Sequence, residues 1–262
     1  MIKRLAVFNL LSVILSILVS YISQTGIING NTMGTISHKY SNLFTPADYA
    51  FSIWGLIYLG LLAFSIFMIH QAYTDGKHTE FIRRTSFWFV VANIATCLWV
   101  FAWLYEFLAI SVVLMFLILL KLLKIILNND MELWDAPFKV IAFYWWPICF
   151  YSGWIAVALI ANMASYLTEL GWDGSFFSQQ DWTIIMIAVA VAINLLMIWL
   201  RNMREFALVG VWALVAIYFR HTGTYDQIAW AAMAGAVLLF LNISYHGFIN
   251  RKENPLYRMI KS

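Results

Sequence analysis

The feature that most constrains this chain is a series of long apolar runs that fill most of its length. A transmembrane helix needs about 20 predominantly apolar residues to cross the hydrocarbon core of a bilayer. Such runs lie at about 5–23, 47–72, 86–105, 107–127, 137–166, 182–200, 205–220 and 227–248. The sequence therefore predicts an all-α integral membrane protein with about eight transmembrane helices.

The composition excludes most other classes of protein. Apolar residues make up 63% of the 262 residues and charged residues 11%, whereas soluble domains carry roughly 45–50% and 25%. These values exclude a soluble enzyme, a disordered chain and a disulfide-stabilised scaffold. The 16 basic residues are scattered rather than gathered into a stripe, so we expect the lipid bilayer and no nucleic acid as a partner.

The distribution of Lys and Arg predicts how the helices are oriented. Cytoplasmic loops of membrane proteins are enriched in basic residues. With eight spans and both termini inside, fourteen of the sixteen basic residues fall in cytoplasmic segments, and only Lys39 and Arg220 fall outside. We expect a protein of the bacterial inner (cytoplasmic) membrane with cytoplasmic N and C termini.

The predicted spans contain no central Asp, Glu, Lys or Arg. This absence argues against a proton relay or a voltage sensor, which usually need ionisable groups inside the membrane. Cys97 and Cys149 lie in apolar runs as small buried residues, the histidines are dispersed, and we expect no metal site. Asn93 and Asn162 lie near the middle of spans, where each amide either bonds to another helix or contacts a ligand.

Tryptophans gather in two of the spans. Trp99 and Trp103 lie in the run 86–105, and Trp146 and Trp154 lie in the run 137–166. An indole has a flat π face and one N–H donor, so several together suit a flat, polarizable ligand. Packing between helices is the alternative interpretation of the same pattern.

Residues 44–58 form the most distinctive segment, which reads FTPADYAFSIWGLIY. Thr45 and Pro46 predict the start of a helix, where Thr caps and Pro fits the first turn. Phe51, Trp54 and Tyr58 then follow at spacings of three and four, which places them on one helical face.

This segment resembles the entry to the second helix of the translocator protein / tryptophan-rich sensory protein family (TspO/MBR). That family has Phe-Thr-Pro-Pro at this point, followed by Phe, Trp and Tyr. Here Ala47 replaces the second Pro, and Trp54 and Tyr58 come one residue early.

A second match lies in the run 137–166. Tyr151, Trp154, Ala158 and Asn162 fall in register with the family pattern Tyr-x-x-Trp-x-x-x-Ala-x-x-x-Asn. The third helix matches less well, because Asn93 stands three residues before the position that the family's Asn-x-x-Trp pattern would give it.

The resemblance implies a five-helix bundle over residues 1–167. Residues 168–262 would then form a C-terminal extension of three membrane helices and a short basic tail. Five-helix relatives are often dimers, so the resemblance implies a homodimer. Alternatively, the three extra helices at 180–250, with Ala231 and Gly235 on one face, would bind a membrane-protein partner.

Family members have a pocket between the helices, covered by the loop after the first helix, and bind tetrapyrroles, sterol-like molecules or synthetic aromatic ligands. Transferred to this chain, the resemblance implies a lid at 24–45, where His38 and Lys39 would meet ligand carboxylates. The predicted ligand-binding residues are Phe51, Trp54, Tyr58, Asn93, Trp99, Trp103, Trp146, Tyr151, Trp154, Ala158 and Asn162. Some members are credited with porphyrin breakdown that involves two tryptophans, which correspond to Trp54 and Trp154.

Three functions follow as hypotheses. The first is a receptor or carrier for a flat apolar ligand, such as protoporphyrin IX, haem, a sterol or an isoprenoid, with no cofactor required. The second is a structural or regulatory membrane subunit. The third is an enzyme that degrades porphyrins or modifies lipids; the sequence favours it least, because it shows no convincing acid, base or metal constellation.

Overall fold

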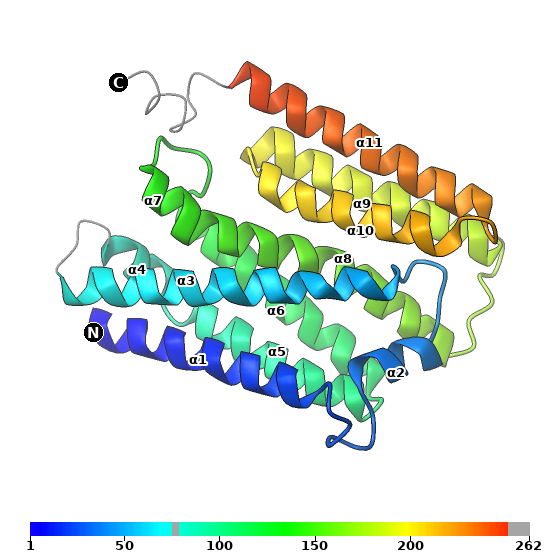
Figure 1. Ribbon diagram of the computed structural model, residues 1–262, viewed down its shortest axis with the longest axis horizontal. Coiled ribbons are helices and arrows are strands. Elements are labelled where there is room, and N and C mark those ends of the chain that lie inside the picture. Colours follow the sequence, from blue (N-terminus) through cyan, green and yellow to red (C-terminus); the bar gives the residue numbers. More distant parts are fainter. Residues whose placement is uncertain (75–78, 251–262) are drawn as a thin grey trace.

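The computed structural model describes residues 1–74 and 79–250, and its long helices run along one common axis (Figure 1). The described residues contain no strand, which confirms the all-α prediction. The elements are α1 (Ile2–Ile22), α2 (Met33–Lys39), η1 (Asp48–Ser52), α3 (Ile53–Tyr73), α4 (Thr79–Thr85), α5 (Trp88–Leu104), α6 (Leu108–Asn128), α7 (Phe138–Val140), η2 (Ile141–Trp145), α8 (Trp146–Glu169), α9 (Gln179–Arg201), α10 (Arg204–His221) and α11 (Asp226–Ile249).

All eight predicted runs are helical, but they differ in how well each suits a membrane span. Within the described residues, six helices are long and apolar enough to cross a bilayer, or seven if α4 and α5, bent by 50°, count as one. The remaining helix, α10, carries Arg204, Glu205 and Arg220 among its 18 residues. Since α10 packs against α8, α9 and α11, much of its surface faces protein rather than lipid.

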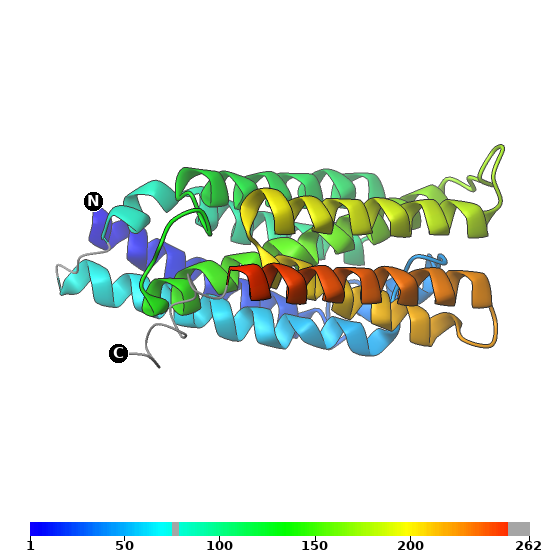
Figure 2. The same ribbon diagram turned by 90° about the horizontal axis from the view of Figure 1, so that it is seen from above.

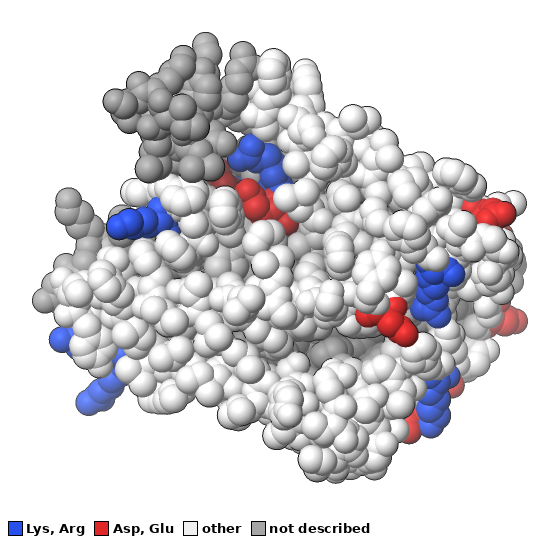
Figure 3. All heavy atoms as spheres, in the orientation of Figure 1, with Lys and Arg blue, Asp and Glu red and all other residues white. Residues whose placement is uncertain are grey.

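On the face shown in Figure 3, charged side chains gather at both ends of the long axis, a further group of basic and acidic side chains lies nearer its middle, and most of the remaining surface is uncharged. The N-terminus lies at one end of the molecule, α11 ends on the same side but nearer the middle, and α2 lies towards the other end (Figure 1). Together with six helices long and apolar enough to span a bilayer, this largely uncharged surface is that of an integral membrane protein.

Two groups of helices lie against each other (Figures 1 and 2). The first contains α1, α3, α5, α6 and α8, and the second contains α9, α10 and α11. The predicted boundary at 167/168 falls in the last turn of α8. Close packing joins the two groups, because a β-carbon placed on Gly153 of α8 would lie 2.8 Å from the carbonyl oxygen of Phe206 on α10.

The second group also holds the segment that leads into α3. Trp212 Nε1 donates to the carbonyl of Ala50 at 3.1 Å, and Arg220 Nη1 donates to the carbonyl of Thr45 at 2.7 Å. The expected helix cap is wrong, because η1 begins at Asp48 and Thr45 lies outside it. The backbone N–H of Thr45 instead donates to Asn42 Oδ1 at 3.0 Å.

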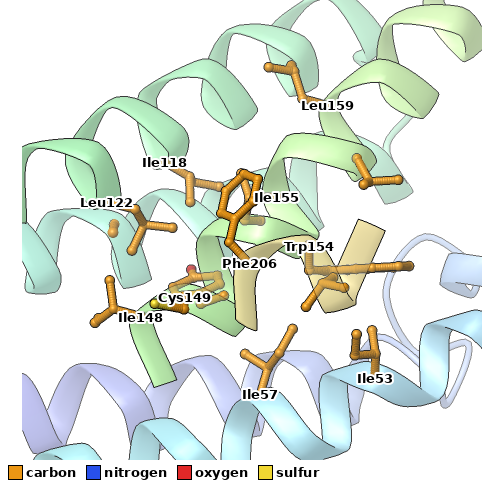
Figure 4. Packing of buried hydrophobic residues seen from close by; sticks show 14 of the residues in the cluster. Ile53, Ile57, Ile118, Leu122, Ile148, Cys149, Trp154, Ile155, Leu159 and Phe206 are labelled. Atoms are coloured by element: carbon orange, nitrogen blue, oxygen red, sulfur yellow. The ribbon is translucent and has the colours of Figure 1, made fainter. Parts of the chain in front are cut away.

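The buried core lies around α8. Trp154 faces Ile53 and Ile57 of α3, and Phe206 reaches from α10 towards Ile155 (Figure 4). None of these five residues is more than 7% exposed. This packing fixes the orientation of the α8 face that carries Trp154, one of the predicted ligand-binding residues.

Candidate functional site

A cavity of about 580 Å³ opens between the first group of helices at the end covered by α2. Its walls come from α1, α2, η1, α3, α5 and α8, with one residue of α6. The lining residues are Ser20, Tyr21, Ser23, Gln24, Met33, Gly34, Ser37, His38, Thr45, Pro46, Asp48, Phe51, Trp54, Gly55, Tyr58, Trp99, Val100, Trp103, Met115, Trp154, Val157, Ala158, Ala161, Asn162 and Ser165.

Aromatic rings form much of the apolar wall. Trp54 stacks on Tyr58 with ring centroids 5.3 Å apart and planes at 26°. Trp99 and Trp103 lie 6.1 Å apart at 29° on the α5 side. The near-parallel planes within each pair present extended flat surfaces to the cavity, as a planar ligand requires.

The α8 wall is a single helical stripe. It runs from Trp154 through Val157, Ala158, Ala161 and Asn162 to Ser165, at spacings of three and four residues. The sequence analysis named three of these six residues, and the same spacing would have identified the other three. Small side chains between Trp154 and Asn162 leave the room that the cavity occupies.

Asn162 connects three helices as well as lining the cavity. Its Oδ1 accepts from Trp99 Nε1 at 2.8 Å, and its Nδ2 donates to Ser111 Oγ at 2.7 Å. The amide therefore bonds between helices and fixes the Trp99 ring at the same time.

Three predicted contact residues lie away from the cavity. Asn93 Nδ2 donates to Ser12 Oγ at 3.0 Å, so this amide joins α5 to α1. Tyr151 is buried behind the lining and contacts Trp54 edge-on at 6.0 Å. Trp146 packs against Phe138 at 5.9 Å, at the start of α8 and away from the lid.

A histidine and a carboxylate lie together at the cavity mouth. His38 Nε2 lies 3.2 Å from Asp48 Oδ2, and both residues line the mouth. Among the described lining residues there is no Lys or Arg. The predicted role of Lys39 in meeting ligand carboxylates does not fit this geometry, because Lys39 lies outside the lining and pairs with Glu106.

Glu106 holds the α2 segment over the mouth. Its Oε2 accepts from Lys39 Nζ and from the Tyr40 hydroxyl, the latter at 2.6 Å. Glu106 occupies the tight turn between α5 and α6 with φ of 63°. Asn29 and Asn31 also donate to the carbonyl of Leu104 beside this turn, at 3.0 and 3.1 Å.

These contacts make the lid sensitive to pH. The hydrogen bonds from Lys39 and Tyr40 hold the pKa of Glu106 below its usual 4.5, and the same pair raises the pKa of Lys39 above 10.5. The stabilisation of the lid by the Glu106 carboxylate is therefore lost as pH falls through the lowered pKa of Glu106. The stabilisation by the Lys39 ammonium group is lost as pH rises through the raised pKa of Lys39. At neutral pH both groups are charged and the lid contacts are complete.

We expect Glu106→Gln to loosen the lid at pH 7. Hydrogen exchange at residues 29–40 should become about 1.5- to 5-fold faster, in keeping with the modest strength of exposed ion pairs. The wild type should show the same increase as pH falls through the lowered pKa of Glu106, after correction for intrinsic exchange rates, and the variant should not. Glu169→Gln, which removes a carboxylate outside the lining, is the control, and equal exchange in all three proteins would contradict the proposed lid contacts.

Comparison with known families gives one match. A family model described as TSPO-like protein matches residues 6–245. The chain belongs to the TSPO-like family. This confirms the resemblance inferred from residues 44–58 and from the α8 pattern, and the match continues through α9 and α10 and most of α11. Comparisons with curated proteins and with solved structures give no significant match.

Membership of the TSPO-like family makes the chain a membrane protein of ligand-binding or transport type. Within the described residues, no group of three or more His, Cys, Asp or Glu side chains is placed to hold a metal ion.

Proposed function

We propose that this TSPO-like protein is a membrane receptor or carrier that takes a flat, largely apolar molecule into the aromatic cavity beneath α2. The observation that supports this most is a cavity of about 580 Å³ walled by two stacked aromatic pairs. Its volume lies within the range of about 300–1,000 Å³ typical of small-molecule sites. Tetrapyrroles such as protoporphyrin IX or haem are the first ligand class, and sterol-like or isoprenoid-like molecules are the second.

The charge at the mouth refines this proposal. Asp48 brings a carboxylate to the lining, whereas Lys39 is held outside it by Glu106. Like charges that approach each other in a partly desolvated site repel. The cavity therefore favours the flat apolar body of a porphyrin over its two carboxylates.

We expect the dimethyl ester of protoporphyrin IX to bind about three- to tenfold more tightly than the diacid. The diacid should gain affinity in Asp48→Asn, while the ester should be unaffected, so the difference between the two should narrow. Equilibrium quenching of tryptophan fluorescence in nonionic detergent, in the dark, measures both affinities. Tighter binding of the diacid would show that a cation reaches its carboxylates and would contradict this part of the proposal.

The first experiment is a titration of the purified protein with protoporphyrin IX in the dark. Saturable quenching supports the receptor or carrier function. Absence of saturable binding of protoporphyrin IX and of a sterol probe, in a sample with cooperative thermal unfolding, would overturn it.

An enzymatic function is tested in the same sample. Trp54 and Trp154 both line the cavity, so porphyrin breakdown would take place within reach of both rings. Loss of the Soret band over time, in light or in darkness, would favour this alternative. A stable band in both conditions supports binding or transport.

We further propose that both termini face the cytoplasm of a bacterial inner membrane, with α2 and the cavity mouth on the opposite side. The support is the excess of basic residues in segments on the side of the N-terminus. A homodimer, or a membrane partner that binds the 180–250 helices, is compatible with this arrangement and defines the subunit alternative.

A further inference from the structure

A second, smaller cavity lies near the same end of the molecule, between the end of α8 and the start of α9. Its volume is about 300 Å³. It exists because α9 packs on α10 and α11 rather than on α8, which leaves the two helices apart at this end. Its lining combines residues 41–43, the last turns of α8, the α8–α9 loop and the first turns of α9.

Two tryptophans form the aromatic part of this second cavity. Trp172 and Trp182 both line it, with ring centroids 5.1 Å apart and planes at 57°. Trp182 is fixed because its Nε1 donates to the carbonyl of Gly174 at 2.6 Å. Gly174 has a φ of +95° and lies so close to Phe177 that a β-carbon there would collide with the Phe177 carbonyl oxygen. The loop is thus built to hold the two rings at an angle.

The charge of this lining is acidic. Asp173 contributes a carboxylate, whose Oδ1 accepts from the backbone N–H of Ser175 at 2.9 Å. The described lining residues include no Lys, Arg or His. Two residues of α10 contact this lining from behind: Arg220 donates to Ser41 Oγ at 2.8 Å, and His221 Nε2 lies 2.8 Å from the carbonyl oxygen of Leu43. Both side chains lie outside the lining.

Two angled indole rings beside a carboxylate suit one kind of ligand. Organic cations, above all quaternary ammonium groups, are attracted to the faces of Trp rings, and a carboxylate adds a direct charge interaction. The hydroxyl groups of Thr168 and Thr183 and the amide of Gln179 also line this cavity. Both hydroxyls already donate to backbone carbonyls, at 3.0 and 2.8 Å, so they offer a ligand their acceptor lone pairs. We propose that the second cavity binds an organic ammonium group of the choline type.

The second cavity is separate from the first. Asn42 lines the second cavity, Ser165 lines the first, and Asn42 Nδ2 donates to Ser165 Oγ at 3.1 Å across the wall between them. Asn42 Oδ1 also accepts from the backbone of Phe44 and Thr45, both at 3.0 Å, which holds this wall in place. The two cavities share no lining residue, so ammonium binding in the second can be tested without a ligand in the first.

Choline chloride is the probe for the test. The protein is labelled with 5-fluorotryptophan, and Trp172→Phe and Trp182→Phe identify the two fluorine resonances. We expect choline to shift both resonances saturably in nonionic detergent. The uncharged isostere 3,3-dimethyl-1-butanol should bind at least tenfold more weakly, because it has the same shape without the positive charge.

A pair of matched variants tests whether the Asp173 carboxylate is the charge that choline contacts. Asp173→Asn should weaken choline binding at least threefold, and Glu169→Gln, which removes a carboxylate near the same end but outside this lining, should leave it unchanged. Trp172→Leu should weaken it more than tenfold without breaking the bond between Trp182 and Gly174. Unshifted resonances with choline, or equal binding of the isostere, would overturn the proposal.

Nanodiscs then distinguish the two sources of an ammonium group. If a lipid headgroup is the occupant, the resonances in phosphatidylcholine nanodiscs should already lie at their choline-bound positions, and those in phosphatidylglycerol nanodiscs should not. If a soluble cation is the occupant, both kinds of nanodisc should give the unbound positions until choline is added.

Discussion

Trp54→Ala should weaken binding of protoporphyrin IX by roughly 5- to 150-fold. Flat bases lose about 1–3 kcal/mol when a stacking aromatic side chain is replaced by alanine, and Trp54 supplies one of the two stacked pairs of the cavity. Trp54 is only partly buried, so the variant should still fold. Trp54→Phe should fall between the wild type and the alanine variant. Equilibrium dialysis in the dark measures all three affinities without relying on tryptophan emission.

The control for this prediction is Trp230→Ala. Trp230 is 63% exposed on α11 and lies outside the described lining, so its loss should leave the affinity unchanged. Trp154 is less suitable for truncation, because it is 2% exposed and its removal would leave a hole that costs about 3–5 kcal/mol. Equal affinities in the wild type and Trp54→Ala, with both proteins folded, would mean that the ligand does not stack on this ring.

The sequence was sufficient for the helices and for part of the cavity. Runs of apolar residues determine helix positions directly, so all eight appear, with boundaries within a few residues of those expected. The face that carries Phe51, Trp54 and Tyr58 follows from helical spacing in the same way, and all three line the cavity. Whether a helix can lie in the bilayer depends also on what surrounds it. Because α10 packs against α8, α9 and α11, it is less apolar than the six helices that qualify as spans.

Contacts between distant segments were beyond what the sequence could predict. The polar residues that line the cavity at the end of α1 and just after it, such as Ser20 and Gln24, follow an apolar run and carry no local signal. The pairing of Lys39 with Glu106 joins residues 67 positions apart, and it removes from the mouth the cation expected there. Tyr151 follows the family spacing but lies behind Trp54, because a neighbouring ring occupies the surface of the wall.

Gly153→Ala should destabilise the protein, although alanine favours helices more than glycine does. A β-carbon at this position would lie 2.8 Å from the Phe206 carbonyl oxygen, 3.2 Å from Val209 Cβ and 3.3 Å from Phe206 Cα. Two of these atoms belong to the backbone of α10, so the clash can be removed only if α8 and α10 move apart. Overpacking of this kind costs about 1–3 kcal/mol, which should lower the apparent Tm by roughly 2–12 °C.

Gly55→Ala makes the same chemical change in α3 and is the matched control. A β-carbon at Gly55 would meet nothing within 4 Å, so the higher helix propensity of alanine should leave stability equal or raise it by up to about 1 kcal/mol. Differential scanning fluorimetry of both variants in the same detergent measures the difference in Tm, and equal Tm values would show that α8 and α10 are not packed so tightly.

Ligand binding should weaken in Gly153→Ala as well, because α10 holds the mouth through Arg220 on the Thr45 carbonyl and Trp212 on the Ala50 carbonyl. The three C-terminal helices would then be required for the cavity that the first group of helices encloses.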